Sequence, residues 1–261
     1  MGELRYDQEA TKQLLAMYIT QDVIAQRRQF LHALSPQEGE RILDVGSGPG
    51  FLAAEIAGAT GPTGSVHGID VSDPMIDLAR NHCAQFPWTT FSQADATRLP
   101  FPDRSFDAVI STQVLEYIPD VDAALAEIHR VLRCNGRVII VDTDWDSMVW
   151  HSNHRRLMDR VLAVWDEHAA DPYLPRTLSN RLSGAGLDVK LQEVVPLLNP
   201  GFVEDTYSNR LIDLIVSFVS GRSGISPNEA QSWADELRQN GVDGQYFFSL
   251  NRYLFHAIKC S

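Results

Sequence analysis

Residues 42–51, ILDVGSGPGF, decide the fold of this 261-residue chain. The run RILDV at 41–45 is short and apolar, which is typical of a buried parallel strand. The run FLAAEIAGA at 51–59 has the spacing of a helix. Between them, Gly46, Gly48 and Gly50 allow a tight turn and a close approach of a ligand to the helix N-terminus. The stretch therefore predicts a strand, a turn and a helix built around a ligand.

The same alternation continues along the chain. Strands are predicted at 66–71, 89–96, 106–114 and 135–143, and helices at 74–86 and 121–133. Strands that alternate with helices of this length form a parallel sheet covered on both faces. The later part has a different rhythm, with helices predicted at 151–169, 177–187, 203–219 and 226–240 and strands at 187–198 and 246–260.

We therefore expect an α/β, Rossmann-like, doubly wound and mostly parallel seven-stranded sheet with helical cap insertions. Three segments follow from this reading: an N-terminal helical cap at 1–37, a ligand-binding core at 38–145, and a helical cap with the last two strands at 146–261. The N-terminal segment contains two predicted helices that break near Thr20.

The glycine spacing narrows the choice of ligand. The dinucleotide fingerprint GxGxxG requires a last glycine at the position of Phe51, and a P-loop requires a GK[ST] that is missing here. Asp70 follows Gly50 by 20 residues and ends the next predicted strand. A carboxylate at that place accepts hydrogen bonds from ribose hydroxyls. The pattern favours a nucleoside-containing ligand and disfavours a dehydrogenase.

Three motifs, LDVGSGPG at 43–50, HGIDVS at 67–72 and QADATRLPFPDRSFDAVIS at 93–111, occur in this order. With them the chain resembles the class I S-adenosylmethionine-dependent methyltransferases, and especially the ubiquinone and menaquinone biosynthesis enzymes and natural-product small-molecule methyltransferases. The resemblance covers about 38–145, and also the predicted helix with NRLSGAGL at 180–187 and the last strands. It implies S-adenosyl-L-methionine as cofactor and methyl transfer to oxygen, carbon or nitrogen of a small organic acceptor.

The resemblance also implies roles for single residues. The glycine loop, with Gly46, Ser47, Gly48 and Gly50, would face the methionine part of the cofactor, and Asp70 would bind the ribose. The remaining cofactor contacts would be Val71 and Met75 beside the adenine, Asp95 and Ala96 at its amino edge, Gln113 beside the sulfonium, and Tyr18 as a cover. Tyr18 and Met75 as plain core positions, and Asp44 as a structural cap of the loop, stay open as alternatives.

Acceptor residues are expected beyond the carboxyl ends of the fourth and fifth strands and in the caps. The stretch DTDWDSMVWHSNH at 142–154, predicted as a loop, is the richest in acids, aromatics and histidines. His151 and Tyr117 are the candidate catalytic residues, needed as a base only if the acceptor must lose a proton. The candidate substrate-binding residues are Glu116, Trp145, His154, Phe202 and Arg210. A surface position for His151 and a surface ion pair for Arg210 are the open alternatives.

Metal and disulfide chemistry have little support. Asp142, Asp144 and Asp146 resemble the start of an EF-hand, but Ser147 and Asn153 stand where glycine and glutamate are required. The three cysteines form no CxxC pair, which is typical of reduced thiols in a cytoplasm. We expect no metal site.

The net charge of the chain disfavours nucleic acid as a partner. With 22 basic and 34 acidic residues the net charge is −12, which disfavours nucleic acid. No run of 18 apolar residues is present, so no membrane span is expected, and the location is expected to be cytoplasmic. Alternatives to small-molecule methyl transfer are a macromolecule methyltransferase and a non-catalytic, cofactor-binding partner subunit. Formation of a homodimer stays open.

Overall fold

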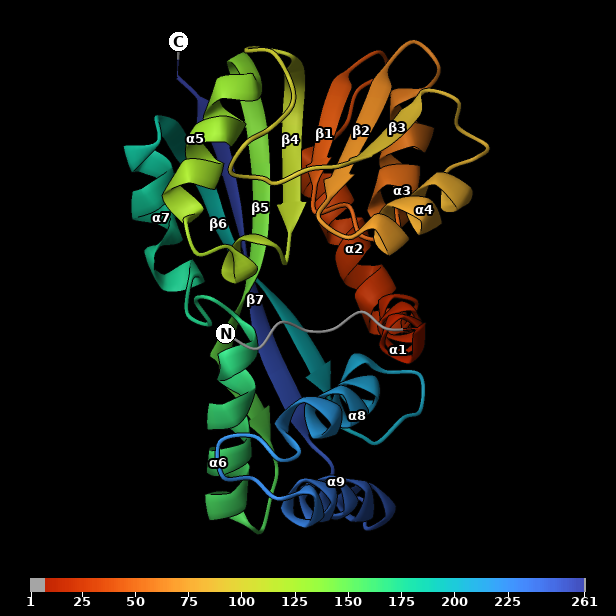
Figure 1. Cartoon of the computed structure of the whole chain (residues 1–261), viewed down its shortest axis with the longest axis vertical. Helices are drawn as coiled ribbons and strands as arrows, with labels where there is room; N and C mark the ends of the chain where they lie inside the picture. Colours follow the sequence, from red (N-terminus) through yellow and green to blue (C-terminus); the bar gives the residue numbers. More distant parts are fainter. Residues whose placement is uncertain (1–7, 261) are drawn as a thin grey trace. The chain divides into compact units, whose positions relative to one another are not determined.

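The computed structural model describes residues 8–260, which divide into two compact units (Figure 1). Unit 1 contains the described residues up to Gln26 together with Asp144–Pro172 and Val195–Arg252. Unit 2 contains Arg27–Thr143, Tyr173–Val194 and the described residues from Tyr253 onward. Residues 1–7 of the expected N-terminal cap lie outside the described part of the chain. The three-segment division expected from the sequence stays a prediction.

Seven strands of the described chain form one sheet, in the order β3-β2-β1-β4-β5-β7-β6. The strands are β1 (Arg41–Val45), β2 (Ser65–Asp70), β3 (Thr89–Gln93), β4 (Phe106–Thr112), β5 (Leu132–Trp150), β6 (Leu187–Asn199) and β7 (Phe248–Lys259). The pairings β3–β2, β2–β1, β1–β4 and β4–β5 are all parallel. The predicted Rossmann-like, mostly parallel seven-stranded sheet is confirmed.

The strand order reverses between β1 and β4. The chain passes from β1 through α3 (Phe51–Thr60) to β2 on one side, whereas β4 lies on the other side of β1. Asp44 stands in register with Gly68 of β2 and with Ile110 of β4. The carboxyl ends of these three strands therefore share one edge, and such a switch point is where open α/β sheets bind ligands.

Helices cover the sheet of unit 2. Figure 1 shows α3 and α4 (Asp73–His82) beside β1, β2 and β3, α5 (Val121–Val131) beside β5, and α7 (Pro175–Gly184) next to α5. The core unites fully buried strand residues such as Val109 and Ile140 with Leu125 of α5 and Leu178 of α7. A short 3-10 turn, η1 (Leu115–Tyr117), follows β4. Burial of this apolar surface is the main favourable term in folding.

Unit 1 is mostly helical. It contains α1 (Gln8–Tyr18), the start of α2 (Gln21–Leu34), α6 (Arg155–Trp165), a 3-10 turn η2 (Asp166–His168), α8 (Tyr207–Val219) and α9 (Pro227–Val242). Its core is rich in tryptophan, with Trp145 and Trp165 at a ring distance of 5.6 Å and Trp150 and Trp233 at 5.5 Å. None of the helices in 8–260 is long and apolar enough to cross a bilayer.

The stretch after residue 143 differs from the prediction. We expected a loop there, but β5 continues to Trp150, and helix α6 begins only at Arg155. In this part the His151 N–H donates to the Phe247 carbonyl (3.0 Å) and the Asn251 N–H donates to Ser147 Oγ (2.9 Å). These pairs run in opposite directions, so β5 and β7 are antiparallel here. The reason is burial: Trp145, Met148 and Trp150 all enter the core of unit 1.

Candidate functional site

The glycine loop between β1 and α3 is a tight turn that has no room for a side chain at Gly46 or at Gly50. Gly46 and Gly50 have φ of 71° and 81°, a left-handed conformation that favours glycine. A Cβ atom on Gly46 would lie 2.1 Å from Cγ2 of Val114, and one on Gly50 would lie 2.9 Å from the Ala79 backbone. The loop backbone therefore lies in close contact with Val114 and Ala79, as expected of a loop that surrounds a ligand.

Asp70 ties this loop to the end of β2. Its Oδ2 accepts a hydrogen bond from the Gly48 N–H, and its Oδ1 accepts one from the Ser72 N–H, both at 2.9 Å. Burial raises the pKa of Asp70, and the backbone N–H groups of Ser72, Gly48 and Val71 oppose that shift. Each carboxylate oxygen has a second lone pair, so Asp70 can accept further hydrogen bonds from a ligand.

Two polar groups under the loop are buried without a hydrogen-bond partner in the described chain: Asp44 Oδ2 and Ser47 Oγ. Asp44 is 2% exposed and Ser47 is 7% exposed. Burial, and secondly the charge of Asp70, raise the pKa of Asp44 to about 7. Unsatisfied buried acceptors are costly in a folded protein. Their presence here indicates a place where a ligand supplies the missing donors.

The other expected adenosine-binding residues lie at the same sheet edge. Val71 directly follows β2 and is 68% exposed, whereas Met75 in α4 is 3% exposed. Asp95 follows β3; its Oδ1 accepts from the N–H and the Oγ1–H of Thr97, both at 2.8 Å. Ala96 beside it is buried. These residues belong to unit 2, together with the glycine loop and Asp70.

The segment after β4 completes this edge. Gln113 has φ of 57°, and its N–H donates to the Val141 carbonyl of β5 at 2.6 Å. Glu116 is completely buried, and Tyr117 is 37% exposed. The Oε2 atom of Glu116 accepts from the Thr143 N–H at 2.6 Å. The structure thus brings Gln113 and Glu116 together with Val141 and Thr143 in the middle of β5.

The remaining expected site residues belong to unit 1: Tyr18, Trp145, His151, His154, Phe202 and Arg210. Trp145 is 5% exposed and packs against Trp165 and His168 in the core. Phe202 packs against Gly241 of α9 and lies 5.1 Å from the Tyr246 ring. Tyr18 is half-buried against the same core. Packing in the core of unit 1 therefore explains the positions of Trp145, Phe202 and Tyr18.

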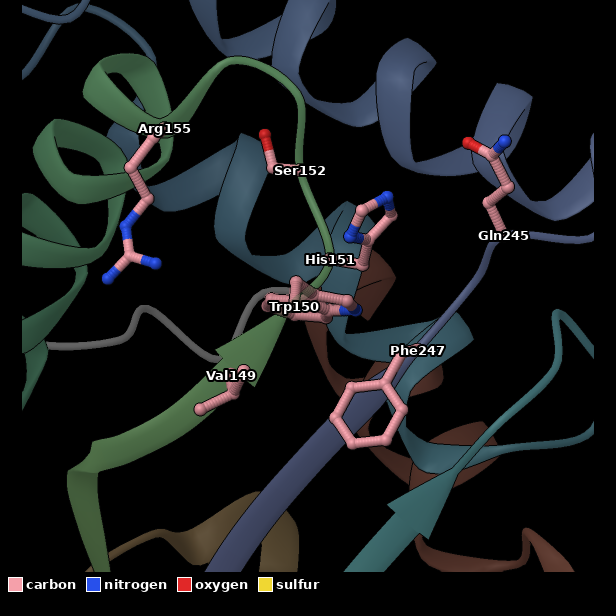
Figure 2. A pocket seen from close by; sticks show the side chains of 7 residues that line it. All are labelled: Val149, Trp150, His151, Ser152, Arg155, Gln245 and Phe247. Carbon is pink, nitrogen blue, oxygen red and sulfur yellow. The ribbon is translucent and has the colours of Figure 1, made fainter.

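His151 and His154 line different cavities of unit 1. The cavity at His151 measures about 530 Å³, within the usual range for a small-molecule site. Its lining is Val149, Trp150, His151, Ser152, Arg155, Gln245 and Phe247. Figure 2 shows the His151 imidazole and the Phe247 ring toward one end of this cavity and the Arg155 guanidinium toward the other. His154 lines a second cavity with Glu236.

Sequence reasoning missed one functional feature of unit 2, which is the pairing of Asp142 with Glu116. Asp142 is completely buried, and its Oδ1 accepts from the N–H groups of Val114 (3.1 Å) and Glu116 (3.4 Å). The available signal was a lone acid in the apolar run VIIVD. Among the described residues no group of three potential ligand side chains could hold a metal ion.

The comparisons agree with this geometry. Residues 43–140 match a family model described as a methyltransferase domain. An uncharacterized 37.1 kDa protein in transposon TN4556 of Streptomyces fradiae is 40% identical over 118 residues, which is 45% of this chain and 34% of that protein. Demethylmenaquinone methyltransferase of Staphylococcus aureus is 35% identical over 117 residues, which is 45% of this chain and 48% of that enzyme.

Solved structures share the fold. Phosphoethanolamine N-methyltransferase 2 of Haemonchus contortus, in complex with S-adenosyl-L-methionine, is 22% identical with a TM-score of 0.65. That match covers 98% of this chain and 58% of that one. At this level of identity the likeness shows the fold alone.

The glycine loop and the acid that ends β2 lie within the region that matches a methyltransferase domain. This chain carries that domain over residues 43–140, and the expected cofactor, S-adenosyl-L-methionine, is confirmed. The matched region spans less than half the length of the two curated relatives.

The raised pKa of Asp44 leads to a prediction on stability. A carboxyl group whose pKa is raised in the folded state stabilises the fold fully below its unfolded pKa, and this stability is lost as the pH rises toward 7. In Asp44→Asn the amide never ionises. Between pH 5 and pH 8, the free energy of unfolding of the wild type should therefore fall by about 1–3 kcal/mol relative to that of Asp44→Asn.

Urea denaturation of the ligand-free chain at the two pH values measures this difference. The amide of Asp44→Asn can alter the packing at every pH. The relevant quantity is therefore how the difference in unfolding free energy between variant and wild type changes with pH. A difference between variant and wild type that is the same at both pH values would contradict the assignment.

Proposed function

We propose that this protein transfers a methyl group from S-adenosylmethionine to a small organic acceptor. The observation that carries the proposal is the Asp70 carboxylate, which accepts from the glycine-loop N–H of Gly48 while keeping lone pairs for a ligand. Asp44 Oδ2 and Ser47 Oγ add buried acceptors without partners beside it. A nucleoside that carries an amino-acid cation suits this combination of acceptors.

The proposed cofactor contacts follow the order of the strands. Asp70 accepts from the ribose hydroxyls, and the loop with Gly46, Ser47, Gly48 and Gly50 holds the methionine part. Val71 and Met75 flank the adenine, and Asp95 and Ala96 meet its amino edge. Gln113 lies beside the sulfonium, and Tyr18 covers the bound cofactor.

A small acceptor agrees with the charge of the chain. The net charge of −12 opposes binding of nucleic acid. The cavity at His151 offers aromatic surface from Trp150 and Phe247 beside polar groups, which is the usual composition of a small-molecule site. The proposed place of action is the cytoplasm.

An acidic group on the acceptor is favoured by two arginines of unit 1. The Nε atom of Arg210 is buried without a hydrogen-bond partner, and no ion pair among the described side chains includes Arg210. Arg252 is 1% exposed with an equally unpartnered Nε, and its Cζ lies 4.9 Å from the ring centroid of Tyr207. Tyr207 precedes Arg210 by one turn of α8. The Arg252 guanidinium also donates to Gln26 Oε1. A buried guanidinium N–H needs an acceptor, and a carboxylate or phosphate of the substrate would supply one for the Nε atom of Arg210.

The cofactor supplies a methyl group that is already activated for in-line displacement. The protein then has to bind both molecules, orient them and exclude water. A carbon or nitrogen acceptor with an available electron pair needs no more than this. For a phenol or alcohol, His151 or Tyr117 takes the proton of the acceptor hydroxyl. Glu116, Trp145, His154, Phe202 and Arg210 are the proposed acceptor contacts.

The first test of this function is transfer of a labelled methyl group from S-adenosylmethionine into small-molecule extracts of the source cell. We expect one labelled small molecule with the wild type, identified by mass spectrometry, and none with Asp70→Ala. The variant loses the ribose acceptor, so its affinity for S-adenosylhomocysteine should fall by about 100-fold, as for the loss of a hydrogen bond to a charged group and its supporting contacts.

Circular dichroism controls for the folding of Asp70→Ala. A label that enters protein or nucleic acid instead of small molecules would favour a macromolecule methyltransferase. Tight cofactor binding without any transfer would favour a non-catalytic partner subunit. An Asp70→Ala variant that binds S-adenosylhomocysteine as the wild type does would remove Asp70 from the site.

The role of Arg210 is tested with the acceptor found in this way. Arg210→Gln removes the charge and should raise KM for the acceptor by about tenfold, which is typical of a lost charge-assisted hydrogen bond, while kcat changes less. Arg238→Gln is the matched control, because Arg238 of α9 already pairs with Asp213 and Asp235. Equal effects of the two variants on KM would contradict the proposed contact.

The role of His151 is tested by kinetics and by cofactor binding. We expect His151→Ala to lower kcat by about 100-fold for a hydroxyl acceptor, because a positioned base contributes this much or more. Its affinity for S-adenosylhomocysteine should stay close to the wild-type value. His32→Ala, an exposed histidine at the end of α2, is the control. Wild-type kinetics in His151→Ala would exclude the residue from the mechanism.

A further inference from the structure

Two completely buried carboxyl groups, those of Glu116 and Asp142, connect the segment after β4 to the middle of β5. Asp142 Oδ1 accepts from the Val114 and Glu116 N–H groups, and Glu116 Oε2 accepts from the Thr143 N–H at 2.6 Å. Each carboxyl group thus binds the backbone of the other's segment. The two segments are held together by side chains as well as by the sheet.

Burial is the main reason why a charge on Asp142 is disfavoured. It raises the pKa of Asp142 well above the ordinary value, and the charge of Glu116 raises it further. The N–H groups of Glu116, Val114 and Leu115 oppose these effects. No ion pair among the described side chains includes Asp142, whose Oδ2 is buried without a hydrogen-bond partner. Two anions in such a place are far more costly than one anion and one acid.

The segment held in this way is in contact with the glycine loop. The side chain of Val114 fills the space above Gly46, where a Cβ atom would lie 2.1 Å from Val114 Cγ2. The preceding residue, Gln113, is in the left-handed conformation and donates to the Val141 carbonyl. Val141, Asp142 and Thr143 of β5 thus anchor the segment 113–116 against the loop.

We propose that Glu116 and Asp142 share a single proton and act as a positioning pair, which holds the segment 113–116 against the glycine loop in the conformation that binds the cofactor. This inference rests on the proposed function, because cofactor binding is its main readout. Loss of the shared proton places two negative charges side by side and loosens the contact of Val114 with Gly46. Cofactor affinity therefore falls as the pH rises through the titration of the pair.

Other charged groups must be separated from this effect. On β1 the buried carboxyl of Asp44 also titrates, and it interacts with Asp70 at the end of β2. Tyr117 follows Glu116 on its own segment, and Asp144 follows Asp142 on β5. A comparison of wild type with a variant of the pair alone cancels these contributions, because they are common to both proteins.

The experiment is calorimetric titration of the full chain with S-adenosylhomocysteine from pH 5.5 to pH 9.5. This probe has an uncharged sulfur, so attraction of a sulfonium does not mask the effect. We expect the wild-type affinity to fall by about tenfold or more relative to Asp142→Asn across this range. In the variant the amide oxygen still accepts from Val114, and the amide nitrogen donates to Glu116. Asp142→Asn should therefore bind at high pH as the wild type does at low pH, and Glu116→Gln should behave in the same way.

Thr143→Val is the matched control. The Thr143 Oγ1 atom is buried beside the pair without a hydrogen-bond partner, so the substitution changes the packing and not the charge. It should keep the wild-type pH profile. A profile of Asp142→Asn parallel to that of the wild type would overturn the proposal, and so would weaker binding of Asp142→Asn at every pH.

Infrared difference spectroscopy of the ligand-free protein tests the shared proton without the cofactor. The wild type minus Asp142→Asn spectrum should contain the band of a protonated carboxyl group near neutral pH, and its absence would overturn the proposal. The infrared band therefore tests the shared proton independently of the proposed function. A wild type that shows the band but binds no S-adenosylhomocysteine at any pH would contradict the proposed function and the positioning role, and would leave the shared proton intact.

Discussion

The hydrogen bonds of Asp70 to Gly48 and Ser72 are the interactions on which the proposed site depends. They join the turn after β1 to the turn after β2, at the edge where the strand order reverses. Without the carboxylate, the N–H groups of these turns have no common acceptor. Burial raises the pKa of Asp44 beneath the loop, and the charge of the same carboxylate raises it further. One side chain thus joins the two turns and contributes to the local electrostatic field.

A second connection supports the loop from the opposite side. Val114 packs over Gly46, and the carboxyl groups of Glu116 and Asp142 hold Val114 in place. The glycine loop thus lies between two acidic anchors, one from β2 and one from β5. The burial of the carboxyl groups of Asp44, Glu116 and Asp142 is costly for the folded protein. A cofactor that carries positive charge would recover part of this cost.

How far the sequence predicts the structure depends on the range of the interactions. The glycine loop and Asp70 are readable because strand, turn and helix are local patterns, and their order defines the family. The stretch 143–150 was wrongly expected to be a loop, because Asp144 and Asp146 suggest solvent while Trp145, Met148 and Trp150 are buried by distant helices. The pairing of Glu116 with Asp142 joins residues 26 positions apart, so no local spacing reveals it. Most of the proposed acceptor contacts belong to unit 1, whose helices pack through contacts between residues far apart in the sequence.

The central claim is that Asp70 and the glycine loop bind the cofactor. A crystal structure of the full chain with S-adenosylhomocysteine tests it most directly. The account predicts ribose hydroxyls within hydrogen-bond distance of the Asp70 carboxylate, with the amino-acid part lying along Gly46 to Gly48. A ligand bound without contact to Asp70, or outside the edge formed by β1, β2 and β4, would contradict it.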